Sequence, residues 1–505
     1  MIKIDGNSLT IENVIKVTRN HEKVKINPNA IDKITKSQKY VEKILNNNEV
    51  VYGINTGVGE LANKLISKSE ISQMQKNIIR SHSTGVGEAF SEEIVRGIIL
   101  LRANALAKGY SGVRLKLIEM LLNLLNEDIY PHIPSQGSVG ASGDLAPLAH
   151  LALVLIGEGE CILKDKRIDS INVLRNNNLT PLELFPKEGL ALINGTQIMT
   201  SIACKVIYDS EILLKNAQIS AGMSLEALKG TSKAFDEKIH AIRPHKGQVR
   251  CAKNMREIIK NSEIIKSHVN CKKVQDAYTL RCIPQVYGAV LDTIEFAKKT
   301  VSVEINSATD NPLIFADENE VISGGNFHGE PIAFAMDYLG IAISEIGNIS
   351  ERTIDRMVNP HVSGLPPFLT KKSGLDSGMM IAQYTAAALV SENKVLAHPA
   401  SVDSIPTSAG QEDHVSMGPI AARHCLDILK NAQNVIAIEM ICATQGIDFQ
   451  KYSPGIGVKL AHKFIRKNIK HLDDDRILYK DIEKLNKFII DGTIVEKVEE
   501  KVKII

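Results

Sequence analysis

The second half of the chain repeats apolar positions with the period of an α-helix. Within residues 415–446, apolar side chains return at helical spacing at Leu426, Leu429, Ile436 and Met440, and Gly446 is a residue type that commonly ends a helix. Similar stretches cover residues 197–228, 285–301, 332–358 and 378–398, the last closed by Pro399. Helices of this length usually pack side by side, so the pattern predicts an elongated helical bundle.

Strand signals are few and short. They consist of β-branched or alternating runs beside turn residues, at residues 1–4, 14–17, 159–167, 313–315 and 321–323. Gly, Pro and Asn gather at residues 131–144 and 305–330, where we expect loops. From Asp475 onward the chain is charged and weakly periodic, which predicts a solvated helix without chemistry.

The predicted fold is therefore mainly α, an elongated bundle of long helices with a smaller N-terminal, loop-rich part and a few short strands. We expect an N-terminal domain over residues 1–200 and a long-helix domain over 201–505. This boundary is soft, and one continuous architecture is the alternative.

Composition narrows the partners and the compartment. The 505 residues hold 60 Lys and Arg against 58 Asp and Glu, a formal charge of +2 that disfavours nucleic acid and anionic membranes as partners. Seven scattered cysteines without a Cys-x-x-Cys pair indicate a reducing cytoplasm rather than a disulfide framework or a zinc knuckle. The first residues are not an apolar leader, and runs such as 147–157 are shorter than a membrane span, so we expect a soluble cytoplasmic protein.

The candidate chemistry begins in a glycine-rich segment, residues 137–149, around Ala141-Ser142-Gly143. Small side chains allow the backbone to be compressed until the Gly143 nitrogen meets the Ala141 carbonyl carbon. Ring closure and two dehydrations, one removing the Ser142 hydroxyl, would leave an electrophilic methylene conjugated to an imidazolone. A helix-capping turn is the plainer alternative, whereas a P-loop would need Lys and Ser or Thr where Asp144 and Leu145 stand. The glycine spacing also differs from that of a Gly-x-Ser-x-Gly nucleophile elbow.

Other loop-like segments also carry reactive side chains. They are Tyr52-Gly53-Ile54-Asn55-Thr56-Gly57, Ser81-His82, Asn194-Gly195-Thr196-Gln197, Gln275-Asp276-Ala277-Tyr278-Thr279-Leu280-Arg281, Asn326-Phe327-His328-Gly329-Glu330 and Gln411-Glu412-Asp413-His414. Together with the Ala-Ser-Gly loop, and in the same order from Tyr52 to Phe449, they closely resemble the aromatic amino acid lyase family, and within it the histidine-selective members.

The resemblance implies an internal cofactor and a base. Ala141, Ser142 and Gly143 would form 4-methylideneimidazol-5-one (MIO) autocatalytically, so no external cofactor is expected. Attachment of the substrate amine to its methylene would make that amine a better leaving group. Tyr52 would take the β proton, which requires surroundings that favour phenolate by roughly 4 kcal/mol at pH 7. A tyrosine that merely packs in a Gly-rich turn is the alternative.

The resemblance also implies the binding groups. Arg281 would hold the substrate carboxylate through a planar, bidentate donor, although a structural salt bridge is the alternative. The polar groups of Gln275, Tyr278 and Asn194 would line the same site, and Phe327 would contact the substrate ring.

His82 and Glu412 match the histidine-selective pattern. A carboxylate can accept a hydrogen bond from an imidazole N–H, whereas an unpaired carboxylate beside a phenyl ring would cost several kcal/mol of desolvation. Alternatively, Glu412 and Asp413 are acidic residues near the positive end of a long helix. Val58 departs from the phenylalanine common in the family and puts the local pocket shape in doubt. Because no histidines have metal-ligand spacing, including His132, His150, His240 and His245, no metal is predicted.

The resemblance implies a homotetramer that converts L-histidine to trans-urocanate and ammonia, the first step of histidine breakdown. Three subunits would build each site: one with Tyr52, His82, the Ala-Ser-Gly loop and Asn194, a second with Gln275 to Arg281, and a third with Phe327 and Glu412. The alternatives are a tyrosine or phenylalanine ammonia-lyase or an aminomutase of the same family, a fumarase-like helical lyase, and a non-catalytic helical scaffold.

Overall fold

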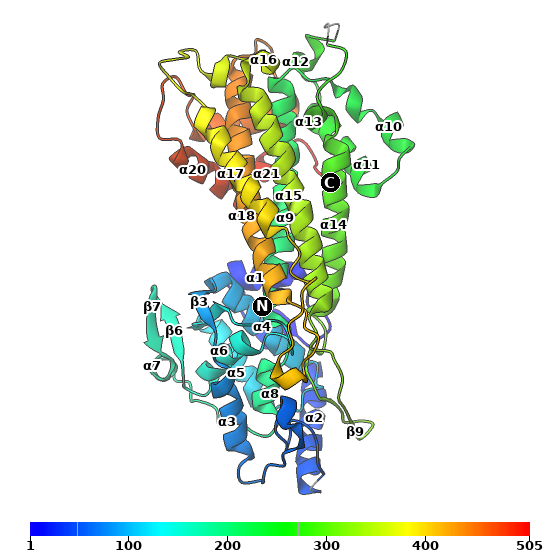
Figure 1. Ribbon diagram of the computed structural model, residues 1–505, viewed down its shortest axis with the longest axis vertical. Coiled ribbons are helices and arrows are strands. Elements are labelled where there is room, and N and C mark those ends of the chain that lie inside the picture. The colour runs from blue at the N-terminus through cyan, green and yellow to red at the C-terminus, as the bar shows by residue number, and fades with distance from the viewer. Residues whose placement is uncertain (48, 270–272) are drawn as a thin grey trace. The chain divides into compact units, whose positions relative to one another are not determined.

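The computed structural model describes residues 1–47, 49–269 and 273–505, and it is mainly helical (Figure 1). The long helices match the predicted stretches closely. They are α9 (Gln197–Ala227), α14 (Ile283–Glu304), α15 (Glu330–Val358), α17 (Met380–Leu396) and α18 (Gly418–Asp448). The mainly α fold class is confirmed.

Contacts divide the chain into two compact, discontinuous units. Unit 1 comprises residues 1–208, 297–337 and 399–423, and unit 2 comprises 209–296, 338–398 and 424–505. By their bounds, α9, α14, α15 and α18 each begin in one unit and end in the other. These contacts do not test whether residues 1–200 and 201–505 are separate domains, so that division stays a prediction.

Unit 1 is built around α4 (Glu92–Ala107), whose residues 94–107 are all buried. A helix that is apolar on every side must be covered on every side, and α4 is contacted by α1 (Ile11–Arg19), α2 (Pro28–Asn46) and α5 (Leu115–Asn126). Unit 1 also contains α3 (Ile71–His82), α6 (Leu145–Leu155), α7 (Ser170–Asn176) and α8 (Glu188–Ile193).

The strands of unit 1 are short and form small separate sheets. β1 (Ile2–Ile4) pairs parallel with β2 (Val24–Ile26), and β3 (Val86–Ala89) pairs antiparallel with β5 (Pro134–Gln136). The other pairings are antiparallel, β4 (Tyr130–Pro131) with β6 (Glu160–Leu163), β6 with β7 (Lys166–Asp169), and β8 (Leu313–Phe315) with β9 (Glu320–Ile322). The expected strands at residues 1–4, 159–167, 313–315 and 321–323 are confirmed within a few residues.

In unit 2, a buried carboxylate joins the long helices. Glu439 of α18 accepts hydrogen bonds from the hydroxyl of Ser224 on α9, at 2.7 Å, and from that of Ser350 on α15, at 2.5 Å. Burial raises the pKa of Glu439 to about 7, against the opposing effect of these serine bonds. Three long helices are therefore connected by one buried polar group.

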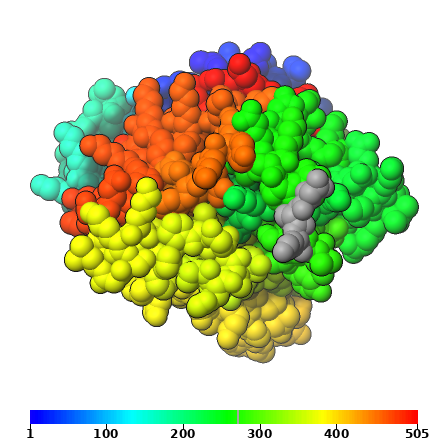
Figure 2. Space-filling view, turned by 90° about the horizontal axis from the view of Figure 1, so that it is seen from above, coloured from blue at the N-terminus to red at the C-terminus, as the bar shows by residue number. Residues whose placement is uncertain are grey.

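The rest of unit 2 consists of shorter helices. They are α10 (Glu237–Ala241), α11 (Lys246–Ile258), α12 (Glu263–Lys266), α13 (Tyr278–Arg281), α16 (Pro360–Ser363), α19 (Ile456–Asn468), α20 (Tyr479–Ile490) and α21 (Thr493–Glu499). In Figure 2 the green segment around α11, the yellow segment around α17 and the orange segment with the end of α18 share the surface of this unit.

Three local predictions were wrong. Residues 14–17 belong to α1, because Ile11, Val14, Ile15 and Thr18 are buried at helical spacing, and this face outweighs the β propensity of valine and isoleucine. Gly446 lies inside α18, where a Cβ would lie 3.0 Å from that of Ala227, so it serves close packing rather than helix termination.

The C-terminal stretch is two helices, α20 and α21, rather than one solvated helix. Gly492, with φ at +78°, separates them, and each helix buries an apolar face that includes Leu485 and Ile489 on α20 and Val498 on α21. This face gives the segment a packing role that its charged composition concealed.

Two predictions concern where the protein lies in the cell: that no helix spans a membrane, and that the cysteines form no disulfide framework. Among the described helices, α15 is long and apolar enough to cross a membrane by length and composition, but 72% of its apolar window is buried inside the protein. A core helix passes the same test, so this is weak evidence for a span. Cys161, Cys204, Cys251, Cys282 and Cys442 are free thiols, and Cys271 lies outside the described residues.

Candidate active site

Unit 1 contains a cavity of about 1330 Å³ that gathers most of the predicted site. The predicted residues among those that line it are Tyr52, His82, Ala141, Ser142, Asn194, Phe327 and Glu412, together with Val58. Gln275, Tyr278 and Arg281 belong to unit 2 and are not among the lining residues. Segments more than 300 residues apart in sequence therefore meet in one cavity.

The Ala-Ser-Gly loop is held by backbone pairing at its end. Gly143 has φ at +75° and forms a parallel bridge with Gly195, whose carbonyl accepts a 2.7 Å hydrogen bond from the amide of Asp144. A Cβ on Gly143 would overlap the carbonyl of Gly195, so no larger residue fits without displacing this backbone. Gly140, with φ at +72°, turns the chain at the other end of the tripeptide.

Asp144 anchors the loop to a long helix. Its Oδ2 accepts hydrogen bonds from the amides of Ile198, at 2.8 Å, and Met199, at 3.3 Å, in the first turn of α9. Burial raises the pKa of Asp144 to about 7, although these amide bonds oppose the rise. The sequence analysis missed this role, and an acidic residue directly after the tripeptide was the available signal.

Asn194 presents an unsatisfied polar atom beside the loop. Its Nδ2 donates to the carbonyl of Asn311 at 3.0 Å, whereas its Oδ1 is buried without a hydrogen-bond partner. A buried acceptor without a donor costs free energy in the isolated protein and is available to a ligand or a cofactor atom.

A buried arginine, Arg102, which was not predicted from the sequence, binds the backbone carbonyl of Asn194. Nη1 of Arg102 donates to the Asn194 carbonyl at 3.0 Å and to Oε1 of Gln197 at 2.7 Å. Burial lowers the pKa of Arg102 to about 10, with the nearby Asp310 acting in the opposite direction. No sequence motif marks this arginine, because its partners lie more than 90 residues away.

Glu412 contacts the predicted cofactor residue directly. Its Oε1 accepts a hydrogen bond from the Ser142 hydroxyl at 3.3 Å, and its Oε2 accepts one from Thr407 at 2.8 Å. The backbones of Thr407 and Glu412 also form an antiparallel bridge. The alternative interpretation of Glu412 and Asp413 as helix-end charges is wrong, because α18 begins only at Gly418.

The phenol of Tyr52 accepts a 3.2 Å hydrogen bond from the amide of Gly59, which favours phenolate. Burial nevertheless raises the pKa of Tyr52, and the negative charge of Glu412 adds to the rise. Within one chain, burial and Glu412 thus oppose the phenolate form of Tyr52, and the Gly59 amide favours it.

His82 lies in the last turn of α3 with its ring orientation constrained. Its Nδ1 is 2.8 Å from the carbonyl of Ile78, a pure acceptor, so Nδ1 carries a proton, and in the neutral ring Nε2 is the acceptor. This neutral tautomer suits a partner that donates an N–H.

The predicted carboxylate-binding segment of unit 2 forms helix α13 and the residues before it. Tyr278 and Gln275 are exposed, and the guanidinium of Arg281 lies 4.5 Å from the centroid of the Tyr278 ring. The Nε of Arg281 is buried without a hydrogen-bond partner. The Nε of Arg281 is therefore free of hydrogen bonds to the other described residues.

Comparisons with known proteins identify the family of this chain. Residues 9–467 match the family model described as aromatic amino acid lyase. The chain belongs to the aromatic amino acid lyase family. It is 52% identical to the histidine ammonia-lyase of Alkaliphilus oremlandii, over 100% of this chain and 99% of that protein.

Solved structures of related lyases agree in fold. The structure of histidine ammonia-lyase from Trypanosoma cruzi has a TM-score of 0.93 at 41% identity and covers 99% of this chain and 96% of its own. The tyrosine aminomutase from Streptomyces globisporus has a TM-score of 0.94 at 39% identity, over 100% of this chain and 99% of its own. The family match extends beyond the predicted span of residues 52–449, and membership makes this chain a lyase.

Aromatic amino acid lyases use the MIO cofactor, and the residues present in this lyase fit it. The glycine at position 143 is the one residue type that its backbone contacts allow, and Ser142 lines the cavity. The unpartnered Oδ1 of Asn194 lines the same cavity. The glycine at position 143 and the unpartnered acceptor of Asn194 therefore fit the MIO ring in shape and polarity.

Proposed function

We propose that this lyase converts L-histidine to trans-urocanate and ammonia, with MIO formed from Ala141, Ser142 and Gly143. The observation that carries the proposal is the hydrogen bond between the Ser142 hydroxyl and the Glu412 carboxylate. This contact sets a carboxylate beside the proposed cofactor residue, and in our proposal the substrate ring lies next to it. The names of the curated relatives support the same substrate.

Two groups are available to recognise imidazole. Glu412 offers carboxylate oxygens and His82 offers Nε2, and both are acceptors for a ring N–H. Imidazole donates such a bond, whereas a phenyl ring leaves the carboxylate desolvated and unpaired at a cost of several kcal/mol. Phe327 supplies apolar contact in the same cavity.

The reaction needs a base and an electrophile. When formed, MIO supplies an electrophile for the substrate amine. Tyr52 accepts the β proton, the electron pair of the broken C–H bond forms the alkene, and ammonia leaves with the electron pair of the C–N bond. The amide of Gly59 stabilises the phenolate that this role requires.

A second subunit completes the site in this proposal. Burial raises the pKa of Tyr52 in the single chain, and a nearby cation would lower it. Our candidate for this cation is Arg281, whose Nε is buried without a hydrogen-bond partner. We retain the predicted homotetramer, with Gln275, Tyr278 and Arg281 contributed by another subunit. The resemblance implies that Phe327 and Glu412 come from a third subunit, whereas their place in one cavity with Tyr52 of the same chain supports a contribution from the subunit that carries Tyr52.

The intact mass and one substitution test the proposal. The purified chain should be lighter than its sequence by two waters, and Ser142→Ala should restore the unmodified mass less one oxygen atom. The variant should fold and assemble normally yet form no urocanate from histidine. Urocanate formation at the parental rate by Ser142→Ala would refute the proposal.

The similarity to tyrosine aminomutase supports a second candidate substrate, tyrosine. Product analysis with histidine, tyrosine and phenylalanine separates the two. Glu412 predicts that histidine is consumed much faster than either of the others. Faster conversion of tyrosine, to coumarate or to β-tyrosine, would favour the second candidate.

A further inference from the structure

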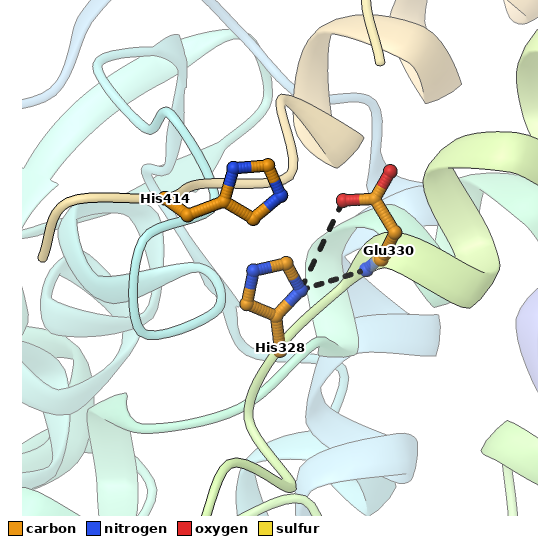
Figure 3. A group of neighbouring side chains, drawn as sticks. All are labelled: His328, Glu330 and His414. Atoms are coloured by element: carbon orange, nitrogen blue, oxygen red, sulfur yellow. Dashed lines mark hydrogen bonds and ion pairs between the residues drawn. The ribbon is translucent and has the colours of Figure 1, made fainter. Parts of the chain in front are cut away.

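Two loop segments of unit 1 bring together three potential metal ligands that the proposed function does not use. His328 precedes α15, Glu330 is its first residue, and His414 lies in the loop before α18 (Figure 3). One ligand atom from each residue lies within 4.8 Å of those from the other two. The two imidazole rings are stacked, with centroids 5.7 Å apart and planes inclined by 13°.

The cluster holds acceptors that face one another. Nδ1 of His328 accepts a hydrogen bond from the Glu330 amide at 3.3 Å and lies 4.0 Å from Oε2 of the same residue. That Oε2 is buried without a hydrogen-bond partner. The Glu330 carboxylate therefore has one buried oxygen without a donor beside two imidazoles, and a bound cation would satisfy that oxygen, with the weak 3.3 Å bond at Nδ1 given up for coordination.

A second cluster of histidines around a carboxylate differs because both carboxylate oxygens have partners within the chain. Asp448 pairs with His462 and His471, at 2.7 Å each, and also with Arg466. Despite the opposing effect of burial, these partners hold the pKa of Asp448 well below its usual range. Arg466 already supplies the cation there, whereas no lysine or arginine among the described residues forms an ion pair with Glu330.

The donor set fits a borderline transition-metal ion. Two imidazoles and one carboxylate form a three-ligand set of the kind that binds Zn²⁺ with a fourth, open position. Ligand atoms around tetrahedral Zn²⁺ are about 3.4 Å apart, given bonds of about 2.1 Å. The present spacing needs shifts of no more than about 1.5 Å, which side-chain torsions can supply.

We propose that His328, Glu330 and His414 bind a divalent transition-metal ion such as Zn²⁺. His328 and His414 also line the cavity that contains Glu412, so the ion would form part of the cavity wall. A divalent charge there would oppose the negative charge of Glu412, two residues before His414. The site does not depend on MIO formation, so it can be tested in the Ser142→Ala variant as well.

The test is a titration of the tag-free, chelator-treated tetrameric protein with Co²⁺, which reports tetrahedral coordination by its intense visible absorption, followed by displacement with Zn²⁺. We expect one tight ion per chain, in the parent and in Ser142→Ala alike. His328→Ala, His414→Asn and Glu330→Gln should each weaken binding at least about tenfold, equal to about 1.4 kcal/mol. His462→Ala, in the second cluster, should leave binding unchanged.

Circular dichroism and size-exclusion chromatography establish that each variant is folded and assembled. Because Glu330→Gln nearly preserves side-chain size, at least one informative variant should pass this check. The proposal is overturned if the parent takes up no Co²⁺, if its spectrum is octahedral, or if substitutions in the two clusters weaken binding equally. If the parent takes up no Co²⁺, the three side chains do not form a metal site.

Discussion

Gly143 and Gly195 lie backbone against backbone in an isolated parallel β-bridge, although 52 positions separate them. The contact leaves no room for a Cβ on Gly143, and its positive φ is costly for any other residue. The tripeptide that we propose to form the cofactor ring thus lies directly against a turn from another part of unit 1. Arg102 holds that turn through the Asn194 carbonyl.

Gly143→Ala should block cofactor formation while leaving the chain folded. The added methyl group would push the loop away from Gly195, and the left-handed backbone adds about 1–2 kcal/mol of strain. The expected result is an intact mass without the loss of two waters, and no detectable urocanate. Gly364→Ala is the matched control, because Gly364 has φ at +70° but no atom near its missing Cβ. A dehydrated, active Gly143→Ala protein would contradict this view of the loop.

Glu412→Gln should weaken histidine selectivity. The amide keeps the side-chain shape and loses the charge, and a hydrogen bond to a charged group contributes about 1.5–3 kcal/mol. We expect kcat/KM for histidine to fall about ten- to a hundredfold. A pH–rate profile separates two roles: loss of one limb with unchanged KM indicates proton transfer, and a higher KM alone indicates imidazole binding. Asp403→Asn, on an exposed part of the same loop, should change neither parameter.

Tyr52→Phe and Arg281→Ala should complement each other. Each variant alone is expected to be inactive, because every site then lacks either its base or its carboxylate-binding cation. If the two residues meet across subunits, random hybrid tetramers made from equal amounts restore about a quarter of the sites. The measurement is urocanate formation after mixed refolding or co-expression. Complete inactivity of verified hybrid tetramers would place both residues in the same chain's site.

Lys187→Met should destabilise unit 1. Lys187 and Asp310 form a 2.7 Å ion pair in which both side chains are almost fully buried. Removing one partner leaves an uncompensated buried charge, which costs about 3–5 kcal/mol. Urea unfolding should show this loss, and Lys187→Met combined with Asp310→Asn should recover part of it. Equal stability of the single and double variants would exclude the ion pair as the cause.

Glu439→Gln should change how stability depends on pH. Burial raises the pKa of Glu439 from 4.5 to about 7, so the folded state binds a proton that the unfolded state has released between these values. This contribution to stability is fully present below pH 4.5 and is lost as the pH rises through 7. It amounts to roughly 3 kcal/mol.

The measurement for Glu439 is the unfolding midpoint of the parent and the variant at several pH values. The stability of Glu439→Gln relative to the parent should increase from pH 5 to pH 8. Glu257→Gln, at an exposed carboxylate of unit 2, should show no such trend. A constant difference between Glu439→Gln and the parent would mean that Glu439 is ionised throughout.

Much of the candidate site was accessible from sequence because its residues lie in short motifs. Tyr52, His82, Asn194 and Glu412 were each predicted from a local segment, and the structure places all four in one cavity. These residues remain proposals as functional groups. Arg102 was missed because its importance comes from partners distant in the chain, whereas the position of Asp144 directly after the tripeptide was a local signal that was not used.

The sequence by itself determined the long helices and the chemistry available in the loops. Helical periodicity depends on neighbours three and four positions apart, so it is written locally, as in residues 197–228 and α9. Where propensity and periodicity disagreed, at residues 14–17, the buried face of α1 prevailed.

Only the tertiary structure decided which loops meet. Packing in unit 1 brings Gly195 against Gly143, Glu412 to Ser142, and His414 to His328, pairs that are separated by 52 to 270 positions. Such contacts depend on how whole helices bury their apolar faces, and no short stretch of sequence contains that information. The physical reason is that local patterns specify elements, whereas the site is made by the packing between them.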